Sequence, residues 1–86
     1  MPRISKYYGI AIYMYFRDHP PPHFHAIYGE HEAVIEISTG KVIDGELPRR
    51  ALKLVVEWTK AHRTELVQNW ARAQAGEPLM PVDPLD

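Results

Sequence analysis

Hydrophobic residues in the first half of the chain occupy every second position over several short stretches. Such alternation is found in residues 9–18, 23–29 and 32–38. A period of two is typical of β-strands with one buried face, and the β-branched and aromatic side chains in these stretches favour strands as well. The turn sequence "TGK" at 39–41 then predicts a hairpin into a short fourth strand over residues 41–45. We therefore expect an antiparallel meander of three or four strands.

The same alternation divides the side chains between two faces of the expected sheet. The face expected to be buried carries Ile10, Ile12, Met14, Phe16, Phe24, Ala26, Ala33, Ile35 and Ile37. The opposite face carries Tyr13, Tyr15, Arg17, His23, His25, Glu32 and Glu36. This second face is rich in tyrosine, arginine and histidine, which are side chains enriched at protein interfaces.

The second half of the chain has a helical pattern. From Pro48 to Ala75 neither glycine nor another proline interrupts the sequence, and apolar residues recur at spacings of three and four. We expect a long C-terminal helix that packs on one face of the sheet and ends at Gly76. The sequence does not decide whether this helix is continuous or broken in two near residues 62–64. Residues 1–76 are thus expected to form a single α+β domain, followed by an extended, proline-rich tail over residues 77–86.

Composition narrows the possible functions. The formal net charge of the 86 residues is -1, so nucleic-acid binding is weakly supported, because it requires a local basic patch. There is no cysteine, which excludes disulfides and thiolate ligands, and a metal would have to be held by His, Asp or Glu. No apolar stretch is long enough for a membrane span, and the N-terminus has no apolar signal core, so we expect a cytoplasmic protein.

The stretch "DHPPPHFHA" at 18–26 is the main candidate for chemistry. His23 and His25 are two residues apart on an expected strand, so both rings can reach one zinc ion, with His19 or a glutamate as a third ligand. The same histidines, with Arg17 beside them, are also suited to acid–base catalysis. A third interpretation is a stiff turn with a polar recognition surface, and the sequence assigns no catalytic residue.

Partner binding is the other function that the pattern favours. The expected contact residues are Tyr13, Tyr15, Arg17, His23, His25, Arg49 and Arg50. The two arginines at 49 and 50 lie where a helix is expected to begin, and cations there oppose the helix dipole, which suggests a role other than helix stability. One expected partner is a second copy of the chain.

Almost the whole chain resembles a bacterial family known as domain of unknown function 4160. The resemblance rests on "PRISKYYGIAIYMYFRDH", on "PPHFHAIYGEHEAVIEI" and on the later "ELVQNW". Members of the family are often encoded next to another small uncharacterised protein, and the resemblance therefore implies a toxin–antitoxin-like or regulatory module. The residues that could carry over are Asp18, His19, His23, His25, Glu65, Asn69 and Trp70, without an assigned role. The alternative function is a metal- or histidine-dependent enzyme that acts on a phosphodiester such as RNA.

Overall fold

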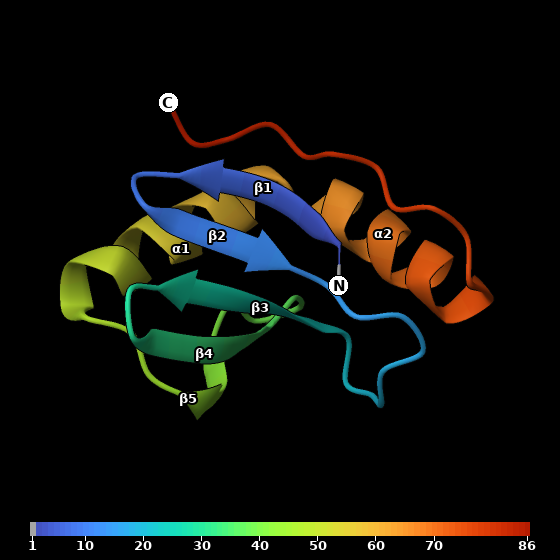
Figure 1. The fold of residues 1–86 in the computed structure, drawn as a ribbon, viewed down its shortest axis with the longest axis horizontal. Coiled ribbons are helices and arrows are strands. Elements are labelled where there is room, and N and C mark those ends of the chain that lie inside the picture. Colours follow the sequence, from blue (N-terminus) through green and yellow to red (C-terminus); the bar gives the residue numbers. More distant parts are fainter. Residues whose placement is uncertain (1) are drawn as a thin grey trace.

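The first layer of the fold is an antiparallel meander. The computed structural model describes residues 2–86 and, within them, shows five strands in the order β1-β2-β3-β4-β5 (Figure 1). The strands are β1 (Arg3–Tyr7), β2 (Ile10–Tyr13), β3 (His23–Tyr28), β4 (His31–Glu36) and β5 (Val42–Gly45). The antiparallel meander is thus confirmed. The expected number of three or four strands is too low, because it lacks β1, whose short sequence "RISKY" has no clean alternation of apolar and polar residues.

The second layer consists of two helices. In the described residues they are α1 (Arg49–Ala61) and α2 (Arg63–Ala75), and both lie on the same side of the sheet (Figure 1). The expected long helix is thus matched only roughly, because the chain breaks at the place that the sequence left open. The backbone at His62 leaves the helical conformation (φ -125°, ψ 23°), and its N–H bonds to the carbonyls of Trp58 and Thr59. The expected end at Gly76 is confirmed, since this residue has φ +72° and closes α2 in the left-handed conformation.

The core lies between the sheet and the helices. All but one of the apolar residues expected on the covered face are buried, from Ile10 in β2 to Ile37 after β4. Trp58 is fully buried at its centre, where its ring contacts Tyr7 (centroids 5.3 Å apart) and Phe24 (5.7 Å). Burying one such aromatic side chain contributes about 2–3 kcal/mol, so Trp58 links β1 and β3 to α1 energetically.

Phe16 is the exception among the expected core residues, because 44% of its surface is exposed. Strand β2 ends at Tyr13, and the chain turns so that Arg17 has φ +52° and donates its backbone N–H to the Ala73 carbonyl on α2 (3.1 Å). The alternation in residues 9–18 therefore predicts a longer strand than the structure has. A contact with a helix distant in sequence takes residues 14–18 out of the sheet.

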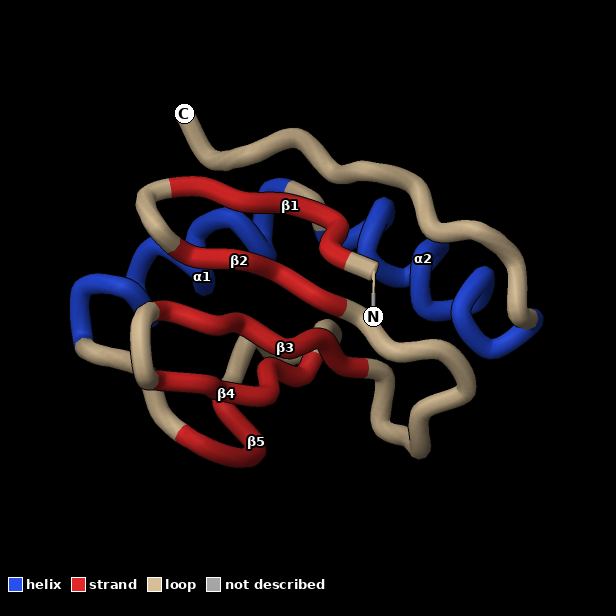
Figure 2. Tube along the Cα trace, in the orientation of Figure 1, coloured by secondary structure: helices blue, strands red, loops and turns tan. Residues whose placement is uncertain are grey.

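The tail has no regular secondary structure but packs on its own domain. It runs beside β1 and along the helices (Figure 2), and Val82 is buried and donates its N–H to the Ile4 carbonyl of β1 (2.8 Å). The indole N–H of Trp58 donates to the Asp83 carbonyl, and the buried Asn69 bonds both the N–H and the carbonyl of Met80. Asn69 is thus a satisfied polar group that attaches the tail to α2.

We predict that the Asn69–Met80 pair stabilises the fold. Asn69→Ala removes two hydrogen bonds and leaves two partly buried backbone groups without them, so the free energy of unfolding should fall by about 2–4 kcal/mol. Urea denaturation followed by circular dichroism measures this change. The exposed neighbour Gln68→Ala is the control, and equal stability of the two variants would contradict the prediction.

Candidate functional site

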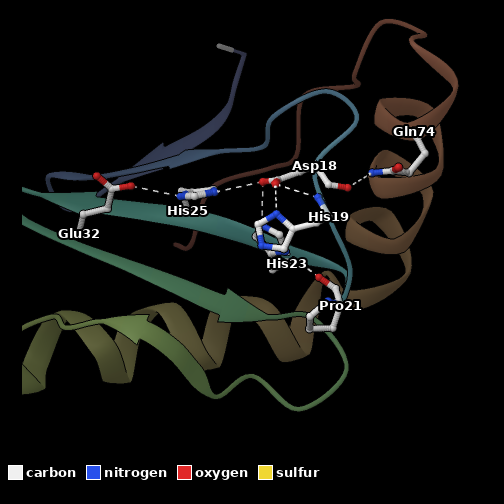
Figure 3. A network of polar contacts seen from close by, with 7 residues as sticks. All are labelled: Asp18, His19, Pro21, His23, His25, Glu32 and Gln74. Carbon is white, nitrogen blue, oxygen red and sulfur yellow. Dashed lines mark hydrogen bonds and ion pairs between the residues drawn. The ribbon is translucent and has the colours of Figure 1, made fainter.

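The site is formed by Asp18 from the segment between β2 and β3 and by two histidines of β3 (Figure 3). One carboxylate oxygen, Oδ2 of Asp18, lies 2.9 Å from Nε2 of His23 and 3.6 Å from Nε2 of His25. The three potential ligand atoms lie within 4.8 Å of one another. His23 and His25 thus do approach each other as strand neighbours i and i+2, and the third group beside them is Asp18.

The position of Asp18 depends on contacts with α2. Arg17 donates its N–H to the Ala73 carbonyl, and the Gln74 side chain donates to the Asp18 carbonyl (3.0 Å) (Figure 3). The Arg17 guanidinium lies against the last turn of α2, so closely that a side chain at Gly76 would collide with it. These contacts hold the backbone of Asp18 from one side, so its carboxylate points toward the histidines.

The histidine rings are oriented through their other nitrogens. Nδ1 of His23 lies 2.6 Å from the Pro21 carbonyl, and Nδ1 of His25 lies 3.1 Å from Oε2 of Glu32. A carbonyl or an ionised carboxylate can only accept, so both Nδ1 atoms donate a proton. In a neutral imidazole the lone pair is then on Nε2, and both lone pairs point to the Asp18 carboxylate.

This arrangement brings three acceptors together. Two lone pairs and an anionic oxygen repel one another unless a positive charge lies between them. The positive charge is either additional protons on the imidazoles or a metal cation. Nε2 of His25 is buried and has no hydrogen-bond partner among the described residues, as expected for an atom that faces a cation site.

The carboxyl of Asp18 is held ionised when His23 carries the additional proton, which is the first of these two alternatives. Burial alone raises the pKa of its carboxyl, but hydrogen bonds from the His19 backbone N–H and from His23, and the attraction of His23, outweigh burial and lower the pKa below its usual value. The carboxylate is therefore ionised at neutral pH. An ionised oxygen is the form that binds a metal.

An open pocket of about 590 Å³ gives access to the cluster. It is lined by the three cluster residues, by Tyr15, Phe16 and Arg17 before them, by His19 and Pro21, and by Val34, Ile43 and Asp44 from β4 and β5. A volume of this size is within the range of small-molecule sites. The cluster can therefore be reached by a ligand from solvent.

The predicted site residues lie in the cluster, beside it or away from it. His23 and His25 lie in the cluster, Tyr15 contacts the His25 ring edge-on (4.3 Å), and Arg17 lines the pocket. The side chain of His19 is 86% exposed and contacts the outer oxygen Oδ1 of Asp18, so it lies beside the cluster rather than in it.

The remaining partner-surface residues lie elsewhere. Tyr13 is half-buried on β2 and pairs with His25 across the strands. His23 is 4% exposed, because the segment before it and the Trp70 ring of α2 (5.2 Å) cover it, so it is not on the open face of the sheet. Arg49 and Arg50 lie at the start of α1, where Arg50 lines a second pocket of about 270 Å³.

Sequence reasoning did not assign two residues their roles at the cluster. Asp18 was named only among the residues that could carry over from the family, and Glu32 only as part of the open face. The signal that could have found Asp18 is its distance of five residues from His23, which a turn can close. No local signal identifies Glu32, because its contact with His25 depends on the register of β3 and β4, which pairs Glu32 with Ile27.

Comparison with known proteins identifies the family and nothing more specific. No curated protein and no solved structure matches this sequence. Within residues 2–86, no helix combines the length and apolar character needed to cross a membrane. The model of one family, described as a domain of unknown function, matches residues 9–71, a range that contains the entire cluster. The chain therefore belongs to the DUF4160 family.

Proposed function

We propose that the chain binds a divalent metal ion at Asp18, His23 and His25. The observation that carries the proposal is the convergence of two Nε2 atoms and one ionised oxygen, with both Nδ1 atoms occupied by other acceptors. Here each ring is held from behind and directed to the same point, as metal-ligating histidines usually are.

Zinc is the cation that best fits these donors. Two imidazoles and a carboxylate, without thiolate, form the type of three-ligand set found in catalytic zinc sites. Three protein ligands leave a further coordination position, and the pocket lies on the accessible side of the cluster. The arrangement thus supports a site where a ligand meets the metal, rather than a closed structural site.

The reaction that this site supports is hydrolysis of a phosphodiester. A divalent cation supplies Lewis-acid polarisation of a phosphoryl oxygen. Arg17 lines the same pocket and adds a positive charge at its rim, with its guanidinium against the end of α2. His19, exposed at the edge of the pocket, contacts only the outer oxygen of Asp18 and has an exposed ring available for proton transfer.

A second candidate function is binding of a protein partner in a two-gene, toxin–antitoxin-like or regulatory module in the cytoplasm. It is favoured by the face of the sheet turned away from α1 and α2 (Figure 1). That face carries half-buried Tyr13 and Tyr15, and Ile43 of β5 is 46% exposed. Because the pocket includes Tyr15 and Ile43, a partner on this face would also control access to the cluster.

The metal proposal predicts saturable binding of one zinc ion. In calorimetric titration of untagged protein, Asp18→Asn, His23→Ala and His25→Ala should each abolish this binding, because each removes a ligand. The exposed His31→Ala is the matched control and should bind as the wild type does. If the wild type does not bind zinc, or if the control loses binding as the ligand variants do, the site is wrong.

The orientation of His25 predicts an effect of Glu32, which does not belong to the cluster itself. Glu32→Ala removes the acceptor at Nδ1 and should weaken zinc binding about 10- to 100-fold, whereas Glu32→Gln keeps an acceptor oxygen and should lose less. Glu30→Gln in the preceding turn is the control. Nitrogen chemical shifts of the His25 ring should show a mixed tautomer in Glu32→Ala, and an unchanged tautomer would contradict the assigned role.

The partner proposal predicts assembly through the open face. Ile43→Asp places a charge on this face and should weaken retention of the adjacent-gene product in co-expression pull-down, or dimer formation in light scattering. Val67→Asp, on an exposed position of α2, is the matched control. A wild-type protein that stays monomeric at high micromolar concentration and does not retain the neighbour excludes this function.

A further inference from the structure

The pocket beside the cluster has an apolar wall that metal binding does not use. This wall is formed by Tyr15, Phe16, Val34 and Ile43. Phe16 is 44% exposed and Ile43 is 46% exposed, although both are large apolar side chains. They lie at the same opening as the charged residues of the cluster, so a ligand that enters the pocket meets both.

The exposure of Phe16 is a consequence of backbone geometry. Arg17, the next residue, has φ +52°, an uncommon conformation for a residue with a side chain. Its N–H is bonded to α2, which holds the turn in place. Phe16 is thus presented to solvent by an ordered, strained turn, and such turns are found most often at binding and catalytic sites.

The polar groups of the pocket have a definite distribution of charge. A cation at the cluster would attract an anionic group on one side, and Arg17 adds positive charge from the rim beside α2. Asp44, on β5, adds a carboxylate to the lining, and its Oδ1 accepts only from the adjacent Gly45 N–H among the described residues. A matching ligand therefore combines an anionic group, a flat apolar part and a hydrogen-bond donor.

We infer that the pocket binds a nucleotide, with the phosphate at the cluster, the base against Phe16, and an exocyclic amino group toward Asp44. This inference rests on the proposed metal site and specifies the substrate class for it. A base has a π-face that stacks on an aromatic side chain, a contact that tolerates different bases. A nucleotide unit of RNA also has this chemistry, and it fits the phosphodiester reaction proposed above.

Three probes test the inference with zinc-loaded protein in calorimetry: adenosine 5′-monophosphate, ribose 5-phosphate and adenosine. Adenosine 5′-monophosphate should bind more tightly than either of the others, because it alone has both the phosphate and the base. Phe16→Ala should weaken its binding about 5- to 100-fold, the loss expected for one base–aromatic stack, and should leave ribose 5-phosphate binding unchanged. Val67→Ala, which removes an exposed apolar side chain on α2, should change neither.

The outcomes separate this inference from the metal proposal. If the wild type does not bind zinc, the metal proposal fails, and the inference fails with it. If zinc binds but adenosine 5′-monophosphate binds no better than ribose 5-phosphate, or if Phe16→Ala has no effect, the base does not use the apolar wall and the inference alone is overturned. If Phe16→Ala instead weakens retention of the adjacent-gene product and not nucleotide binding, Phe16 serves a protein interface. Thermal unfolding of Phe16→Ala shows whether the fold is intact, as expected for an exposed turn residue.

Discussion

The fold depends on the burial of Trp58. Its ring contacts Tyr7 of β1 and Phe24 of β3, and lies 5.6 Å from the ring of His62, where α1 ends. Its indole N–H donates to Asp83 in the tail. A meander of short strands is marginally stable until one face is covered, and this single side chain joins the sheet, the helix junction and the tail.

The cluster depends on a different constraint, which is the attachment of the segment after β2 to the end of α2. Arg17 and Gln74 form the two hydrogen bonds of this attachment, and Gly76 leaves space for the Arg17 guanidinium. These contacts hold Asp18 over β3. The core thus depends on Trp58 of α1, whereas the end of α2 places the carboxylate of the candidate site.

The pocket of the site and the open face of the sheet have side chains in common. Tyr15 and Ile43 belong to both, and Glu32 on β4 orients His25 from the side of the strands. Gly45 permits the pairing of β5 with β4, because a side chain there would overlap the Glu32 carbonyl. The proposed metal binding and the proposed partner binding would therefore involve shared side chains, so each proposed function bears on the other.

The sequence by itself determined the elements that local pattern controls. Alternation identified β2, β3 and β4 and the buried face, and the uninterrupted stretch after Pro48 identified the helical half with its end at Gly76. These features follow from side-chain periodicity and from the conformational limits of glycine and proline, which act within a few residues. The spacing of His23 and His25 likewise followed from the geometry of a strand.

Only the tertiary structure decided the remaining features. The helix break at His62 has no glycine or proline to mark it, and the ends of β2 and the exposure of Phe16 depend on a bond to Ala73, far away in sequence. The tail docks through Asn69 and Trp58 rather than through any pattern of its own. Asp18 and Glu32 reach the histidines from two sides because a docked turn and a strand register bring them there, and a sequence records such contacts only through the fold.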